Sequence, residues 1–170
     1  MTVLKHTAVR RSLLGALLLL AGTGLFAQQP RLVVGIVVDQ MRYDYLYRYA
    51  ANYGEGGFKR FLREGVSCEN THYDYVPTYT APGHACVYTG TNPALNGIIA
   101  NEWFDPQLGK HRYVTADARY RTVGATGRVG QHSPAVLLST TITDELRMAH
   151  NFRSKVVGVC LKDREIGRAH

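Results

Sequence analysis

The expected fold is set by an apolar stretch near the start of the chain, RLVVGIVVDQ (residues 31–40), which ends in the carboxylate of Asp39. A continuous apolar run without alternation is typical of a strand buried on both faces of a parallel sheet. In α/β folds, ligands gather beyond the carboxyl ends of such strands. The stretch therefore predicts a central strand with a candidate functional residue, Asp39, at its end.

Helical and extended patterns alternate along the chain around this strand. We expect two further strands, in VSCENTHYDYV (66–76) and KVVGVCLKDR (155–164). We expect helices in YDYLYRYAANYG (43–54), in GGFKRFLREG (56–65), which stops at Gly65, and in APGHACVYTG (81–90), which is closed by Gly90. This order predicts an α/β fold with a mostly parallel sheet flanked by helices.

The middle of the chain is more irregular. TNPALNGIIANEWFD (91–105) is read as a loop followed by an aromatic, strand-like piece, and residues 106–132 as a surface hairpin or insertion. Ser133 and Pro134 are a good N-cap and first-turn pair, so a helix is predicted to begin there. Its apolar positions would share one face: Leu137, Leu138, Ile142 and Leu146.

The first 27 residues have the order of a secretory signal peptide: three cations, an apolar run over 13–20 and an Ala-Gln junction at 27–28. We expect an exported protein, periplasmic or secreted. The apolar run is too short for a comfortable membrane span, so no stable membrane anchor is expected, with an uncleaved N-terminal anchor as the alternative. Without these three cations the formal charge falls from +7 to 7 − 3 = +4. The remaining basic residues are scattered, so no nucleic-acid polymer is expected as a partner.

Composition fits one soluble globular domain, since the 170 residues are 45% hydrophobic and 19% charged. Cys68, Cys86 and Cys160 would allow one disulfide and one free thiol in an exported protein, and the pairing is open. No CxxC spacing occurs in the sequence, which gives no support to a thiolate zinc site.

Thr80 stands in VPTYTAPGHACVYTG (76–90), directly before an expected helix. A threonine there either caps the helix or acts as a nucleophile, because a helix N-terminus also favours an anion. Its hydroxyl would need activation, for example by a metal that Asp39 ligates. We expect Thr78 to serve only the turn, and His84 to have a packing or hydrogen-bonding role and not that of a base.

Three more polar residues could serve the same chemistry. Asn101 could donate to a phosphoryl oxygen or simply form a turn. Lys162 and Arg164 are two apart and would share one side of a strand. There they could clamp a dianionic phosphoryl group, the alternative being a solvated strand end.

Taken together, VVGIVVDQMRYDYL (33–46), PTYTAPGHACVYTGTNPALNGIIANEWFD (77–105) and GVCLKDR (158–164) resemble the alkaline phosphatase superfamily. The resemblance is to its type I phosphodiesterase/nucleotide pyrophosphatase-related branch, in particular to bacterial periplasmic alkaline phosphatases with a threonine nucleophile. It implies an enzyme that hydrolyses small phosphorylated substrates, and the Lys-x-Arg pair indicates that these are phosphate monoesters. The alternatives are a nucleotide phosphodiesterase or pyrophosphatase of the same superfamily and a non-catalytic exported binding module.

The resemblance also implies a site with two zinc ions. Asp39 would ligate one zinc, and Thr80 would bridge toward that zinc and be phosphorylated transiently. Asn101 would donate to a phosphoryl oxygen. Lys162 and Arg164 would recognise the terminal phosphate.

The other zinc ligands of this family come from the C-terminal half of a longer chain, and the sequence stops at His170 before them. We therefore expect residues 31–164 to be the N-terminal part of a catalytic domain, inactive alone. None of the other histidines stands in a replacing motif: His72, His111, His132 and His150. The ending EIGRAH (165–170) matches the translation of a common sequencing-adapter start, so we expect it to be a non-native tail.

Overall fold

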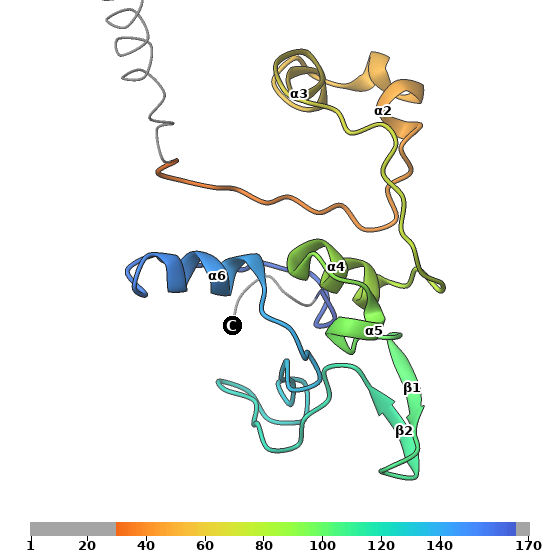
Figure 1. Ribbon diagram of the computed structural model, residues 1–170, viewed down its shortest axis with the longest axis vertical. Helices are drawn as coiled ribbons and strands as arrows, with labels where there is room; N and C mark the ends of the chain where they lie inside the picture. Colours follow the sequence, from red (N-terminus) through yellow and green to blue (C-terminus); the bar gives the residue numbers. More distant parts are fainter. Residues whose placement is uncertain (1–29, 166–170) are drawn as a thin grey trace, which may run out of the picture. The chain divides into compact units, whose positions relative to one another are not determined.

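The computed structural model describes residues 30–165 (Figure 1). The chain divides into two units, Met1–Ile36 and Val37–His170. The described residues of the first unit, 30–36, contain no helix or strand, so every element named below belongs to the second unit. The predicted signal peptide (1–27) and residues 166–170 of the predicted tail lie outside the described residues.

Three short elements follow Asp39: α2 (Tyr45–Arg48), the 3-10 helix η1 (Ala50–Asn52) and α3 (Phe58–Glu64). They confirm the two helical segments predicted from the sequence. Helix α3 ends at Gly65, as expected, and a Cβ at that position would lie 2.6 Å from the Phe61 carbonyl oxygen. Glycine is therefore required where this helix stops.

Helix α4 (Thr80–Thr89) is the element on which the site is built. Gly90 closes it in the left-handed conformation, with φ of 66°, and its N–H donates to the Cys86 carbonyl at 2.9 Å. Ala81 and Ala85 are fully buried on one face. The predicted helix is confirmed, and its small residues allow close packing against the rest of the unit.

Helix α5 (Pro93–Asn96), a single turn that contacts α4, was not predicted (Figure 1). The buried Asn96 side chain stabilises this turn, since its Oδ1 accepts from Ile98 N at 2.9 Å and its Nδ2 donates to the Thr91 carbonyl at 3.2 Å. Gly97 follows with φ of 81°, and a Cβ there would lie 2.9 Å from the Val136 carbonyl oxygen. The chain can pass this point only without a side chain.

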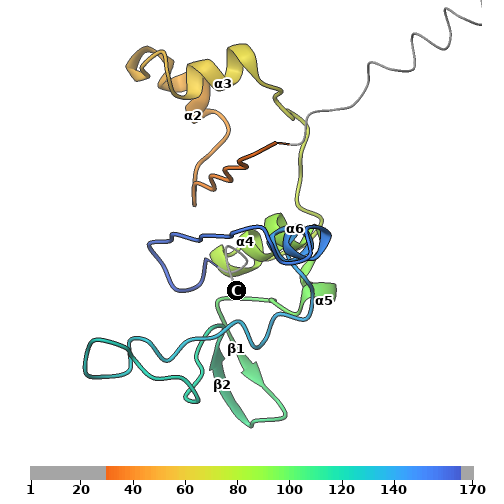
Figure 2. The ribbon, with the colours of Figure 1, turned by 90° about the vertical axis from the view of Figure 1, so that its left-hand side faces the viewer.

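Strands β1 (Glu102–Asp105) and β2 (Lys110–Tyr113) form an antiparallel hairpin, seen in Figures 1 and 2. The hairpin confirms both the aromatic strand and the predicted surface hairpin. Among the described residues, the buried apolar core consists of Ala81, Ala85, Ile98 and Val114, with Trp103, Tyr113, Val136 and Leu137 packed around it. Because α4 and the hairpin share this core, the ends of the hairpin lie near the start of α4.

Helix α6 (Ile142–Ala149) lies beside α4 in both views (Figures 1 and 2). The predicted start at Ser133 is wrong, because a capping box fixes the start at Ile142. Asp144 N donates to Thr141 Oγ1 at 3.3 Å, and Thr141 N donates to Asp144 Oδ2 at 2.8 Å. The predicted apolar face is also wrong, since Leu138 and Ile142 are 76% and 65% exposed.

None of the three strands predicted at 31–40, 66–76 and 155–164 is formed, and the hairpin is the only sheet among the described residues. A central parallel strand is stabilised by neighbours on both edges and by cover on both faces. No described segment supplies these neighbouring strands or this cover, so Val33, Val157 and Leu161 are 66%, 84% and 100% exposed.

Two other findings concern the described chain. No helix within residues 30–165 has the length and hydropathy that crossing a membrane requires. Cys68, Cys86 and Cys160 are all free thiols, so the disulfide that the sequence allowed is not formed in this structure.

Candidate active site

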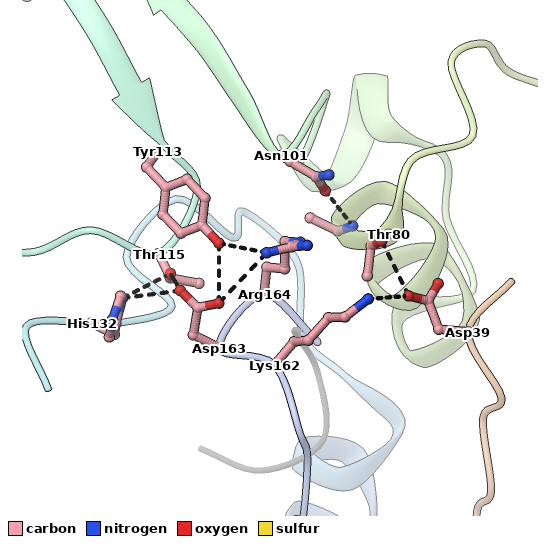
Figure 3. Close-up of polar contacts among 10 residues, drawn as sticks. Asp39, Thr80, Asn101, Tyr113, Thr115, His132, Lys162, Asp163 and Arg164 are labelled. Atoms are coloured by element: carbon pink, nitrogen blue, oxygen red, sulfur yellow. Dashed lines mark hydrogen bonds and ion pairs between the residues drawn. The ribbon is translucent and has the colours of Figure 1, made fainter. Parts of the chain in front are cut away.

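Thr80 is the first residue of α4, and its hydroxyl does not cap the helix. The N-cap residue is Tyr79, which makes no side-chain cap hydrogen bond. Thr80 Oγ1 instead donates to Asp39 Oδ2 at 3.3 Å (Figure 3). Of the two roles that the sequence left open, capping is excluded in this structure. The hydroxyl lies at a helix N-terminus, where the helix dipole favours negative charge.

Asp39 also binds Lys162, although 123 residues separate the two in the chain. Lys162 Nζ donates to Asp39 Oδ2 at 2.9 Å, the same oxygen that accepts from Thr80. The hydrogen bond from Lys162 is the largest cause that lowers the pKa of Asp39. The carboxylate is therefore ionised at neutral pH and links the start of α4 to residue 162.

Asn101 lies at the start of the hairpin and is fixed by two hydrogen bonds. Its Oδ1 accepts from Ala81 N at 2.9 Å, and its carbonyl accepts from Val114 N at 3.0 Å. Because the backbone N–H of Ala81 can only donate, the amide orientation is determined, and Nδ2 is the donor that remains. No residue among the described ones accepts from Nδ2, which suits the predicted role as a phosphoryl donor.

Arg164 is held by a different partner, the phenol of Tyr113. Arg164 Nη1 donates to Tyr113 Oη at 3.1 Å, and this hydrogen bond is the largest cause that raises the pKa of Arg164. The Nε atom of Arg164 is buried and has no partner among the described residues. Figure 3 shows Lys162 directed toward Asp39 and Arg164 toward Tyr113. Both cations join the group from a turn and not from the predicted strand.

Four residues of this region had no assigned role at the sequence level: Tyr113, Thr115, His132 and Asp163. Asp163 Oδ1 accepts from Tyr113 Oη at 3.0 Å, and Oδ2 accepts from Thr115 Oγ1 at 3.2 Å. Its place between Lys162 and Arg164 in the sequence is the one available signal. No local sequence pattern indicates Tyr113 or Thr115, because the hairpin is what brings them close to Asp163.

His84 has the packing and hydrogen-bonding role expected for it. The side chain is 3% exposed, and Nδ1 donates to the Thr80 carbonyl at 2.9 Å. That carbonyl can only accept, so Nδ1 carries the proton and Nε2 is left as an acceptor. His84 thus braces the backbone of Thr80 and makes no hydrogen bond to its hydroxyl.

The described residues offer fewer ligands than a zinc ion requires. A catalytic zinc takes three protein ligands, and no group of three or more His, Cys, Asp or Glu residues that could hold a metal occurs in the described part of the chain. Asp39 and Thr80 are two ligand residues at most, and Oδ2 of Asp39 accepts from Lys162. The described residues therefore do not complete a zinc site, and the ligand roles of Asp39 and Thr80 stay predictions.

Known proteins resemble this chain over most of its length. The model of the family "Type I phosphodiesterase / nucleotide pyrophosphatase" matches residues 33–166. Alkaline phosphatase PhoV of Synechococcus elongatus is 60% identical over 80% of this chain and 25% of its own length. Alkaline phosphatase PafA of Elizabethkingia meningoseptica is likewise 60% identical over 80% of this chain and 25% of its own. The chain thus spans about a quarter of the curated relatives that it matches.

Solved structures agree with the family match. The crystal structure of wild-type alkaline phosphatase PafA superposes with a TM-score of 0.79 at 58% identity, covering 82% of this chain and 27% of that one. A second PafA structure, with the same TM-score, is of a variant in which a threonine, an asparagine, a lysine and an arginine are substituted. The predicted fold class is confirmed by this match. The chain belongs to the type I phosphodiesterase / nucleotide pyrophosphatase family and has the alkaline phosphatase fold over the portion that it spans.

Proposed function

We propose that this chain carries the nucleophile-bearing part of a phosphomonoesterase active site, with Thr80 as the nucleophile. The observation that carries the proposal is the Thr80 hydroxyl at the start of α4, which caps no helix and donates to Asp39 at 3.3 Å. Relatives named alkaline phosphatases support the reaction class. The PafA variant supports the choice of residues, since its four substituted residue types are those of Thr80, Asn101, Lys162 and Arg164.

In the proposed reaction, Thr80 Oγ attacks the phosphorus in line with the ester oxygen. The new Oγ–P bond forms as the ester P–O bond breaks, the hydroxyl proton of Thr80 passes to solvent, and the leaving oxygen takes up a proton from solvent. A water then hydrolyses the phosphothreonine, which restores the Thr80 hydroxyl and releases phosphate. Asp39 orients the hydroxyl by accepting its hydrogen bond. The positive end of α4 and the Asn101 amide stabilise charge on the phosphoryl oxygens.

Lys162 and Arg164 would decide between ester classes. A terminal phosphoryl group has one more ionisable oxygen than a diester, and two cations at this point favour the more negative group. The family description favours a second candidate, a nucleotide phosphodiesterase. That candidate requires no such pair, so the two cations favour the monoester.

We propose two zinc ions as the cofactor, with the ligands beyond Asp39 and Thr80 supplied outside the described residues. Bound zinc would lower the pKa of a coordinated hydroxyl and stabilise the leaving oxygen. Since the described residues offer only two donors, we propose that they do not turn over substrate unaided. The basic and apolar order of residues 1–27 supports action on small phosphorylated substrates outside the cytoplasm.

The test compares an aryl phosphate monoester with the matching diester, using the complete gene product with zinc. We expect the monoester to be the better substrate. Arg164→Ala should lower kcat/KM for the monoester by about 100-fold and change diester hydrolysis far less. Arg121→Ala, at an exposed arginine, is the matched control. A wild-type preference for the diester would overturn the monoesterase proposal.

A further inference from the structure

The Tyr113 hydroxyl lies between two charged groups, and the direction of each hydrogen bond is determined (Figure 3). A guanidinium can only donate, so Tyr113 Oη accepts from Arg164 Nη1 at 3.1 Å. A carboxylate can only accept, so the same hydroxyl donates to Asp163 Oδ1 at 3.0 Å. The single phenolic proton is thereby committed to Asp163, which leaves a lone pair for Arg164.

Asp163 is in turn anchored to the loop that follows β2. Its Oδ2 accepts from Thr115 Oγ1 at 3.2 Å. The Thr115 hydroxyl has only one proton, which it donates to Asp163, so the same hydroxyl accepts from His132 Nδ1 at 2.9 Å. Thr115 is 5% exposed, and its carbonyl accepts from Ser133 N at 2.8 Å. The carboxylate is therefore bound through both oxygens to buried or backbone-fixed groups.

Backbone structure does not explain where Arg164 lies. Residues 155–164 form no helix or strand, and Leu161 is 100% exposed. An arginine on such a segment has many rotamers, so its guanidinium needs side-chain partners to stay in one place. Among the described residues, the guanidinium makes one direct hydrogen bond, which it donates to the phenol of Tyr113.

We propose that Tyr113 is a positioning residue that holds Arg164 ready for the terminal phosphoryl group, with Asp163 and Thr115 as its support. The inference rests on the proposed function, in which Arg164 binds that group. Asp163 Oδ1 is 4.0 Å from Arg164 Nη1, too far for a hydrogen bond. Without the phenol between them, the carboxylate would draw the guanidinium toward itself and away from the substrate.

The first test is Tyr113→Phe in the complete gene product with zinc, which removes one oxygen and keeps the ring. We expect kcat/KM for an aryl phosphate monoester to fall about tenfold, because a hydrogen bond to a charged group is lost. The diester rate should stay within twofold of wild type. Tyr120→Phe, at an exposed tyrosine outside this network, is the matched control. An unchanged monoester-to-diester ratio in Tyr113→Phe would overturn the proposal.

A double-mutant cycle separates positioning from simple structural support. If Tyr113 acts through Arg164, Tyr113→Phe should cause no further loss of monoester activity in an Arg164→Ala background. An equal fold-loss in both backgrounds would overturn the proposal, because the hydroxyl would then act independently of Arg164.

A third comparison addresses the support from Thr115. Thr115→Ser keeps the hydroxyl that donates to Asp163 and should retain the wild-type ester ratio, whereas Thr115→Val should reduce it. Equal ratios in the two variants would contradict the supporting role. The failure of the proposed function would look different, since Thr80→Ala would then retain activity or Arg164→Ala would leave the ester ratio unchanged.

Discussion

The two halves of the candidate site, the start of α4 and the segment 155–164, are held in different ways. Thr80 begins a ten-residue helix in which Ala81 and Ala85 are fully buried. Lys162 and Arg164 lie on a segment without helix or strand, and their side chains are held by hydrogen bonds to Asp39 and Tyr113.

Because of this difference, substitutions in the two halves should affect stability and activity differently. The position of Thr80 depends on core packing, so substitutions that disturb this packing should lower stability and activity together. The positions of the two cations depend on single polar contacts, so conservative polar substitutions there should change catalysis and leave stability almost intact.

The largest effect should come from Thr80, the proposed nucleophile. Thr80→Ala removes the attacking oxygen while Ala81 and Ala85 stay buried, so kcat should fall by at least about 10³-fold with little change in the unfolding midpoint. Steady-state kinetics on an aryl phosphate monoester measure this loss. Thr78→Ala, in the preceding turn, is the matched control and should stay near wild type. A larger loss of kcat in Thr78→Ala than in Thr80→Ala would exclude Thr80 as the nucleophile.

A large effect on stability should come from Gly97→Ala. The added Cβ would lie 2.9 Å from the Val136 carbonyl and 2.9 Å from Leu138 Cγ, in a backbone with φ of 81°. We expect the free energy of unfolding to fall by about 2–4 kcal/mol, measured from urea denaturation.

Gly109→Ala is the control for Gly97→Ala, since φ is 62° there and nothing lies within 4 Å of an added Cβ. It should cost only about 1–2 kcal/mol, the price of the backbone conformation alone. Equal losses in the two variants would mean that packing at Gly97 does not contribute to stability.

The smallest effect should be a pH dependence at the loop that carries Thr115 and His132. The hydrogen bond from Arg119, followed by the one from Ser133, lowers the pKa of Asp117 well below its ordinary value near 3.8. Asp117 should therefore stabilise the fold above about pH 3.8, and this contribution should be lost as pH falls through the lowered folded pKa. Thermal unfolding measured between pH 2 and 7 would show this loss of stability. Asp117→Asn should reduce the fall of Tm at acid pH, and an unchanged fall of Tm would contradict the stabilising role of Asp117.

Locally determined elements could be predicted from the sequence. Helix α3 ends at Gly65 and α4 at Gly90, because both stops depend on residues within one turn. The strand predicted at 31–40 is not formed, since a strand needs partners that periodicity does not reveal. The start predicted at Ser133 failed because the Thr141–Asp144 capping box competes with it and fixes the helix later.

The candidate site was partly readable from the sequence. The motif residues Asp39, Thr80 and Lys162, far apart in sequence, meet in one hydrogen-bonded group, and their catalytic roles stay predictions. Tyr113 could not be found in this way, because its role depends on how the β1–β2 hairpin packs beside residues 163–164.

The central claim, that Thr80 is the nucleophile, is tested most directly by locating the phosphoryl group. The complete gene product with zinc would be mixed with a phosphate monoester, quenched in acid, digested and sequenced by mass spectrometry. We expect a phosphoryl group on Thr80, distinguished from Thr78 by fragment ions, and none in the Thr80→Ala variant. A phosphoryl group on another residue, or wild-type turnover in Thr80→Ala, would contradict it.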